Sequence, residues 1–323
     1  MKIPYFLLLT AYYLLLSTIT LATEVDVKVE KGESVTQIAE KLYTERVIKH
    51  PFWFKVWVKI TGNERKIKAG YYKFACPTSI RETLRKLVIG ESAEFLVTVP
   101  EGATLKEMAD LFSQKCGMNK VEFLRLAQDS AFVRTLGIQA KTLEGYLFPD
   151  TYLVSYGVKP GEMIQRMVDQ FFQVFNPFKD RAKEIRFSVE ETVILASLIE
   201  KEAVYDAEKP IISGVYHNRL KAKMLLQCDA TIQYILPERS SSLTYRDLKI
   251  DSRYNTYIHI GLPPGPIGSP GKRAIIATLW PDDTPYWYFV AQGDGTHIFS
   301  RTLKEHNKAK LKVKSEKLSR ANL

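Results

Sequence analysis

The sequence is poor in the residues that build metal centres and disulfide frameworks. Its 323 residues include three cysteines and five histidines. Cys76, Cys116 and Cys228 are widely spaced, which excludes a disulfide-rich scaffold and a cysteine-based zinc motif. The histidines lack a His-Glu-x-x-His spacing, so we expect no metal.

A phosphate-binding loop is also missing. The Pro/Gly-rich segment 261–271 lacks the Gly-Lys-Ser/Thr that would follow the glycines, so we expect no nucleotide and no other cofactor. The net charge of +10 does not indicate nucleic acid, because the N-terminus favours export from the cytoplasm. The composition is otherwise that of a globular protein, with 46% apolar and 25% charged residues.

Charge is absent from Ile3–Ala22, a run of twenty residues. Such a run is long enough to span a bilayer as a helix, and we predict a transmembrane anchor over residues 1–23. The alternative is a cleaved signal peptide, since the run ends in Thr-Leu-Ala. Lys2 precedes the run, whereas Glu24 and Asp26 follow it. This asymmetry predicts a cytoplasmic N-terminus and an extracytoplasmic remainder.

Two segments repeat one pattern. Residues 27–42 and 97–112 each show an alternating strand, a glycine turn, a hydroxyl residue and an amphipathic helix. Ser34 and Thr104 are the expected N-caps, and we expect a complete capping box only at Thr104, with Glu107. The first copy resembles the start of a LysM module, which binds N-acetylglucosamine polymers, and predicts a LysM-like domain at 24–92.

Trp53 and Trp57 stand four residues apart in an aromatic segment between the two copies. Exposed aromatic side chains can stack on sugar rings. A Trp/Phe stripe at helical spacing is more often part of a core, and we therefore expect both side chains to be buried.

A buried helix is predicted to end in two glutamates. Ser188 and Glu191 form a capping box, and the helix is apolar nearly all round until Glu200 and Glu202. At 3.6 residues per turn, Glu200 lies on a face of small side chains and Glu202 on the opposite face. A carboxyl group on such a dry face suits general-acid catalysis. The alternative is a helix-end glutamate paired with a basic residue.

Polar residues are set among apolar ones in segments 215–234 and 254–271. Amide, hydroxyl and carboxyl groups in this setting suit a neutral sugar polymer, which is recognised by hydrogen bonds. The candidate binding residues are Asn218, Gln227, Asp229, Tyr254, Asn255 and Thr256.

Residues 285–307 predict two strands joined by a Gly-Asp-Gly hairpin turn. The chain ends in a basic tail, assigned to 308–323. From Arg301 onward, eight Lys or Arg and two Glu give this end a net charge of +6. Such a tail suits anionic lipid or an acidic polymer, or is simply a solvated helix end.

Five motifs occur in the order typical of the MltG/YceG endolytic murein transglycosylases, across residues 95–307. They are LEGYLFPDTY, ASLIEKEA, VYHNRL…LLQCDATIQY, YNTY…GLPPGPIGSPG and YFVAQGDGTHIFSRTLKEHN. The resemblance implies an α+β protein with a mixed α/β catalytic domain at 93–307. It identifies Glu200 as the catalytic residue and adds Glu144 and Tyr146 as candidate substrate contacts. One departure is Gln-Cys-Asp-Ala-Thr at 227–231, where the family has Gln-Ser-Asp-Pro-Thr.

The resemblance implies a lyase that cuts the MurNAc–GlcNAc bond of nascent peptidoglycan and leaves 1,6-anhydro-MurNAc ends. Its expected location is the bacterial cytoplasmic membrane, with cell-wall synthases as candidate partners. Two alternatives remain. One is a non-catalytic peptidoglycan-binding scaffold. The other is a glycoside hydrolase, which would need a second carboxylate such as Asp229, Asp251 or Glu144.

Overall fold

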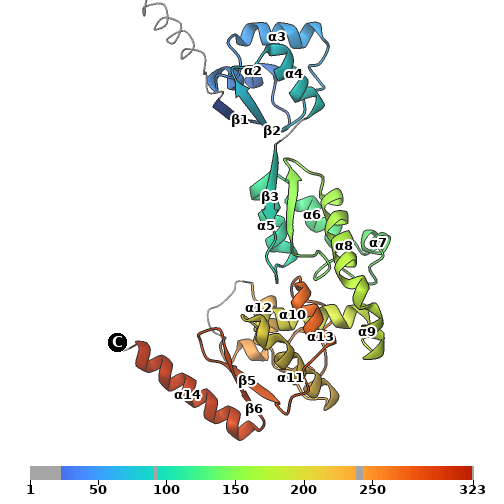
Figure 1. The fold of residues 1–323 in the computed structure, drawn as a ribbon, viewed down its shortest axis with the longest axis vertical. Coiled ribbons are helices and arrows are strands. Elements are labelled where there is room, and N and C mark those ends of the chain that lie inside the picture. Colours follow the sequence, from blue (N-terminus) through green and yellow to red (C-terminus); the bar gives the residue numbers. More distant parts are fainter. Residues whose placement is uncertain (1–22, 91–92, 238–242, 322–323) are drawn as a thin grey trace, which may run out of the picture. The chain divides into compact units, whose positions relative to one another are not determined.

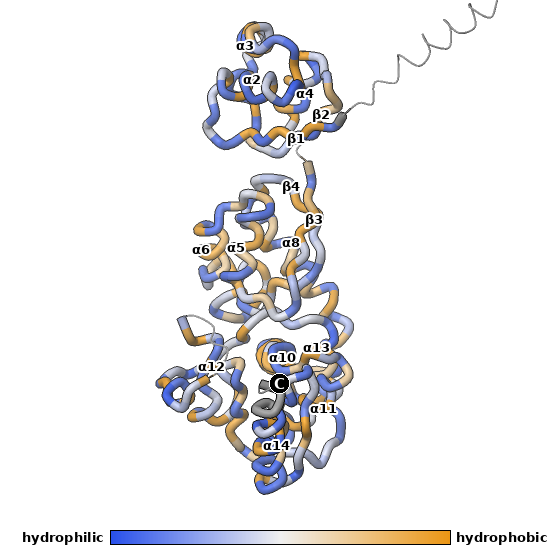
Figure 2. Tube along the Cα trace, turned by 90° about the vertical axis from the view of Figure 1, so that its left-hand side faces the viewer, coloured by the Kyte–Doolittle hydropathy of each residue, from blue (hydrophilic) through white to orange (hydrophobic). Residues whose placement is uncertain are grey.

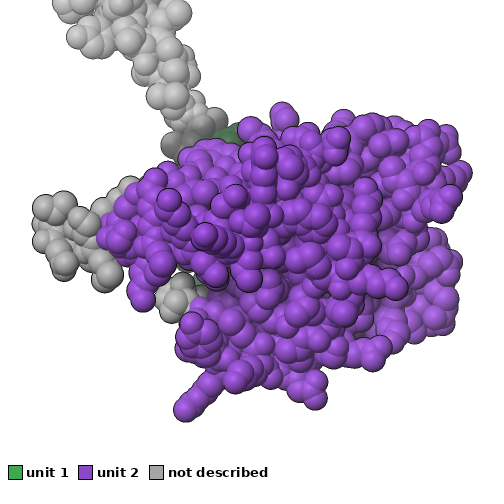
Figure 3. Space-filling view, turned by 90° about the horizontal axis from the view of Figure 1, so that it is seen from below, with its two compact units in different colours: residues 1–95, 153–157 green, residues 96–152, 158–323 purple. Residues whose placement is uncertain are grey.

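The computed structural model describes residues 23–90, 93–237 and 243–321, so nearly all of the expected N-terminal anchor lies outside the described residues. Within these ranges no helix is long and apolar enough to cross a bilayer. The chain forms two compact units, coloured in Figure 3. The first runs to Phe95 and includes Leu153–Gly157, and the second comprises Leu96–Tyr152 and Val158–Leu323. Helices and three two-stranded sheets in the described part confirm the α+β class.

The first unit is built on an antiparallel strand pair with three helices (Figure 1). Its elements are β1 (Thr23–Val29), α2 (Val35–Thr44), α3 (Pro51–Ile60), β2 (Gly70–Cys76) and α4 (Ile80–Ile89). The register sets Val27 opposite Tyr72, and both side chains are buried with Leu42 and Phe54 in one core. The LysM-like assignment stays a prediction, because only the order of strands and helices bears on it.

Hydroxyl side chains begin the helices of both repeated segments. The Thr104 capping box with Glu107 is confirmed. The expectation that Ser34 lacks one is wrong, because the Gln37 side chain accepts from the Ser34 backbone N–H at 2.9 Å. A glutamine carbonyl oxygen accepts this hydrogen bond as a glutamate carboxylate does.

The prediction that Trp53 and Trp57 are core residues is wrong. Their exposed fractions are 58% and 42%, whereas Phe54 and Val58 on the same helix are fully buried. Helix α3 is apolar on more than one side, and the sequence pattern does not tell which side meets α2 and α4.

The remaining helices and strands run from β3 to α14. The elements are β3 (Glu94–Thr98), α5 (Leu105–Cys116), α6 (Lys120–Gln128), α7 (Ser130–Thr135), β4 (Thr151–Ser155), α8 (Pro160–Phe175), α9 (Lys179–Glu184), α10 (Val189–Glu202), α11 (Lys209–Lys221), α12 (Asp229–Ile235), α13 (Lys272–Leu279), β5 (Tyr288–Ala291), β6 (His297–Ser300) and α14 (Leu303–Ala321). Strand β3 pairs with β4, and β5 pairs with β6 as the predicted hairpin. Helix α14 runs through the predicted boundary between 307 and 308.

Helix α10 is the buried helix expected from the sequence. Its capping box joins Ser188 and Glu191, and Thr192–Ile199 are buried without interruption. It packs against α11, α12 and α13, and belongs to the hydrophobic orange segments of Figure 2. This packing fixes the position of the two glutamates in its last turn.

Candidate active site

The small-residue face of α10 is covered by backbone of the Pro/Gly-rich loop. The Ile267 N–H donates to the Ser197 hydroxyl at 3.1 Å, and the Gly271 N–H donates to Glu200 Oε2 at 2.9 Å. A Cβ on Gly271 would lie 1.7 Å from Glu101 Oε1, so a larger residue there would displace the Glu101 side chain. Small side chains on this face therefore make room for a loop of the protein itself.

Glu200 belongs to a buried ion-pair cluster. Its side chain is 7% exposed, and Oε1 accepts from Lys209 Nζ at 2.8 Å. Lys209 is 3% exposed and also contacts Asp206 at 2.9 Å and Glu101 at 3.8 Å. Burial opposes the charge of Lys209, but hydrogen bonds to Glu200 and Asp206 raise its pKa above the ordinary value. This is the arrangement of a helix-end glutamate paired with a basic residue.

Glu202 has different surroundings. Glu202 is half-buried, and its carboxyl group accepts a hydrogen bond from the Cys228 thiol, with 2.9 Å between oxygen and sulfur. Burial raises the pKa of Glu202, and the bond from Cys228 opposes that rise. Glu202 therefore meets a different segment of the chain from the loop that contacts Glu200.

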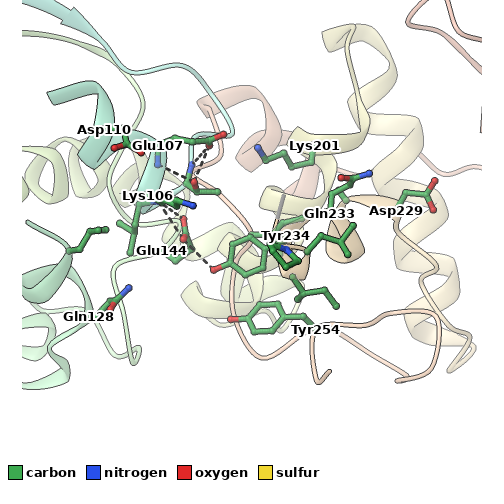
Figure 4. Close-up of a pocket in the computed structure, with 18 of the residues that line it drawn as sticks. Lys106, Glu107, Asp110, Gln128, Glu144, Lys201, Asp229, Gln233, Tyr234 and Tyr254 are labelled. Carbon is green, nitrogen blue, oxygen red and sulfur yellow. Dashed lines mark hydrogen bonds between the residues drawn. The ribbon is translucent and has the colours of Figure 1, made fainter. Parts of the chain in front are cut away.

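A pocket of ≈ 1020 Å³ opens between α5, α10 and α12 (Figure 4). Glu202 lines it, and Glu200 is not among its lining residues. In Figure 4, Glu144 and Asp229 lie on opposite sides of the pocket, with Tyr234 between them. The lining combines carboxyl, amide, ammonium and aromatic groups, and this combination suits a carbohydrate.

Glu144 contributes another carboxyl group to the pocket, from a buried residue. It is 7% exposed and accepts from the Leu105 N–H at 3.2 Å, at the start of α5, and from the Tyr234 hydroxyl at 3.3 Å. Burial raises the pKa of Glu144 to about 7, although both hydrogen bonds oppose the rise. Gly145 next to it has φ +83°, and a Cβ there would lie 2.5 Å from Pro266.

Two further predicted binding residues line the pocket. Tyr254 packs its ring against Tyr234, with 5.1 Å between centroids. Asp229 begins α12 and accepts a hydrogen bond from the Tyr257 hydroxyl. Together with Glu144, they are the predicted contacts that the fold brings to one cavity.

The remaining residues predicted to bind substrate make hydrogen bonds or packing contacts within the protein. Tyr146 is buried, and its ring centroid lies 5.4 Å from that of Phe171. The Asn218 side-chain amide donates hydrogen bonds to the Thr284 and Tyr286 carbonyls. Asn255 donates to two carbonyls of the preceding loop.

Thr256 holds the segment that ends at Asp229. Its carbonyl accepts from the Gln227 N–H at 3.1 Å, and its hydroxyl accepts from the Cys228 N–H at 3.0 Å. Thr256 is buried and does not line the pocket. It therefore orients the backbone around Cys228.

Several pocket residues were not predicted from the sequence. Gln233 and Tyr234 lie one turn after Asp229 on α12. A helix predicted to start at Asp229 would have indicated that Gln233 lies on the same side of the helix as Asp229. Lys201 stands between the two glutamates and also lines the pocket. Lys209 followed by proline reads as an ordinary helix start, and nothing in that pattern indicates its burial.

Within residues 23–90, 93–237 and 243–321, no group of three or more His, Cys, Asp or Glu side chains could hold a metal ion. The Asp251 side chain, weighed as a second carboxylate, belongs to an exposed residue and does not line the pocket. The carboxyl groups that line it are Glu107, Asp110, Glu144, Glu202 and Asp229.

Comparison with known proteins identifies the family. The YceG-like family model matches residues 27–312. An endolytic murein transglycosylase of Bacillus subtilis is 35% identical over 311 residues, covering 91% of this chain and 86% of the relative. One of Streptococcus pneumoniae strain D39 is 28% identical, covering 88% of this chain but 57% of its own length. The crystal structure of a YceG-like protein from Listeria monocytogenes has a TM-score of 0.64 at 32% identity, covering 88% of this chain and 98% of that chain. The chain described here belongs to the YceG-like family.

Proposed function

We propose that this chain is an endolytic murein transglycosylase, a lyase that cleaves the MurNAc–GlcNAc bond of peptidoglycan strands. The single observation that carries the proposal is the carboxyl group of the half-buried Glu202, which has a raised pKa and lines a large polar pocket. A carboxyl group with a raised pKa is suited to donate a proton to a glycosidic oxygen. The names of the relatives fit this substrate.

The reaction needs one acid that later serves as the base. Glu202 donates its proton to the glycosidic oxygen while the bond from that oxygen to C1 of MurNAc breaks. The C6 hydroxyl oxygen of the same sugar then bonds to C1, and its proton passes to the Glu202 carboxylate. The product is a 1,6-anhydro-MurNAc end, the acid is restored, and no water is consumed.

Glu200 is the catalytic residue implied by the family motif, whereas the pocket favours Glu202. The Lys209 ammonium group and the Gly271 N–H occupy both oxygens of Glu200. These contacts support a structural role for Glu200, which holds the last turn of α10 against the Pro/Gly-rich loop. The two glutamates contact different groups. Substituting each one separately therefore distinguishes Glu200 from Glu202 as the catalytic acid.

A glycoside hydrolase is the second candidate, and Glu144 is the observation that favours it. Hydrolysis uses a pair of carboxyl groups, one as acid and one as base or nucleophile. Glu144 lines the same pocket, and burial raises its pKa to about 7. Under the transglycosylase proposal, Glu144 instead holds the start of α5 and Tyr234 in place.

Mass analysis of the products from purified murein distinguishes these functions. A transglycosylase releases fragments whose muramyl ends are one water lighter than those of a hydrolase. Products that carry the added water would assign the hydrolase mechanism. No cleavage by folded protein would favour the non-catalytic scaffold.

We further propose a single-pass anchor at residues 1–23 with the catalytic unit outside the cytoplasmic membrane, where cell-wall synthases are candidate partners. The support is the uncharged run Ile3–Ala22. Protease added to intact protoplasts should digest the chain beyond Thr23 and leave a small membrane-bound stub. Complete protection would exclude this orientation.

A further inference from the structure

Helix α3 presents an apolar outer face that no other part of the first unit covers. Phe52, Trp53, Trp57 and Ile60 are 62%, 58%, 42% and 74% exposed. At 3.6 residues per turn these positions fall within about 140° of one side of the helix, opposite the buried Val58. We call these four residues the α3 outer face. Exposed apolar clusters of this kind mark a surface that meets another apolar phase.

Basic residues surround this face. Residues 43–68 contain seven Lys or Arg and two Glu, a net charge of +5. Lys55 and Lys59 lie on α3 itself. A helix with tryptophan and phenylalanine on one side and lysine beside them is typical of helices that lie in the interface of an anionic bilayer.

The chain brings this unit to the bilayer. The uncharged run ends at Ala22, and β1 begins at the next residue, Thr23. Thr23 already pairs with Cys76, so no flexible spacer separates the proposed anchor from the folded unit. Tyr43, Arg46 and Lys49 line a hollow with Cys76, which places basic and aromatic side chains beside that strand end.

A sugar chain is the less favoured occupant. Sugar-binding aromatic residues normally lie in a concave site with hydrogen-bonding groups around them. Trp53 and Trp57 line neither the hollow beside Cys76 nor the two pockets of the second unit. The face is apolar, and apolar side chains without a hollow around them suit acyl chains better than a sugar ring.

We infer that the α3 outer face lies in the headgroup region of the anionic membrane that holds the anchor. It is an interfacial contact of the first unit, and it rests on the proposed anchor. Trp53 and Trp57 enter the acyl boundary, while Lys55 and Lys59 meet lipid phosphates. This contact holds the first unit on the bilayer.

Tryptophan quenching in the full-length protein tests this inference. The chain has four tryptophans, of which Trp53 and Trp57 belong to α3, while Trp280 and Trp287 lie elsewhere. Trp280 is a matched control, since its exposed fraction is 44% against 42% for Trp57. Protein is reconstituted into vesicles of phosphatidylglycerol and phosphatidylcholine with bromine on the upper acyl chains. W280F/W287F should be strongly quenched relative to unbrominated vesicles, and W53F/W57F should not.

Equal quenching of both variants, or none in W280F/W287F, overturns the inference. Loss of murein binding by F52S/W53S/W57S together with unquenched α3 tryptophans would assign the face to glycan instead. Alkaline carbonate extraction tests the anchor separately from the α3 contact. A chain that resists extraction is anchored, whether or not α3 touches lipid. Cleavage of soluble murein fragments is assayed on the same variants and reports the proposed function independently.

Discussion

The Cys228 thiol donates a hydrogen bond to the carboxyl group of Glu202, with 2.9 Å between sulfur and oxygen. Burial raises the pKa of Cys228 well above its ordinary value, so the thiol keeps the proton that it donates. The bond stabilises the carboxylate form of Glu202 and limits the rise of its pKa. The residue at position 228 therefore adjusts the proton affinity of the proposed acid.

Substitution of Cys228 should move the pH profile of murein cleavage. A serine hydroxyl donates a stronger hydrogen bond than a thiol, so C228S lowers the pKa of Glu202, and C228A raises it. The acid must be protonated, so the fall of kcat/KM at high pH should occur at lower pH in C228S and higher pH in C228A. C116S is the matched control, because the Cys116 thiol donates to the Phe112 carbonyl within α5. Unchanged profiles in both Cys228 variants would show that the thiol does not act on the acid.

Glutamine substitution should separate the two glutamates of α10. Glu202→Gln removes the transferable proton and should lower kcat/KM by about 10²- to 10⁴-fold. Glu200→Gln should lose much less activity and show its effect in stability, because it weakens the pair with Lys209. Steady-state cleavage of murein and thermal unfolding measure both. An inactive, folded E200Q beside an active E202Q would return the catalytic role to Glu200.

Glu144→Gln should flatten the pH dependence of stability. The pKa of Glu144 is about 7 in the folded protein against 4.5 for an ordinary glutamate, so the native state binds the proton more tightly. Its contribution to stability is present below pH 4.5 and is lost as pH rises to about 7, by about 3 kcal/mol. Denaturant unfolding between pH 4.5 and 8 should show a smaller loss in E144Q than in wild type, and Glu202, whose pKa is also raised, contributes in both proteins. An equal loss in both proteins would assign the pH dependence to other groups.

Lys209→Met should destabilise the fold by about 3 to 5 kcal/mol, because it leaves the buried Glu200 carboxyl group without its cation. The double variant K209M/E200Q should recover part of this loss. Lys183→Met is the control, since Lys183 pairs with Asp180 at the surface, and should change stability by less than about 1 kcal/mol. Urea unfolding is measured for wild type, K209M, E200Q, K209M/E200Q and K183M. Additive effects of K209M and E200Q would mean that the two residues do not interact.

The sequence by itself determined the features that depend on local chemistry. Capping hydroxyls at Ser188 and Thr104 fixed two helix starts, since their side chains satisfy backbone N–H groups within a few residues. The apolar run Thr192–Ile199 identified α10 as buried. Ordered motifs over two hundred residues identified the family.

Tertiary structure decided which faces of these helices meet which partners. The small side chains beside Glu200 suggested room for substrate, but the backbone of loop 266–271 fills that space. Likewise, the spacing of Trp53 and Trp57 fits a buried face as well as an exposed one. Helical periodicity gives the angle between two side chains on one helix. What lies opposite each side chain is set by segments distant in sequence, here Gly271 for Glu200 and Cys228 for Glu202.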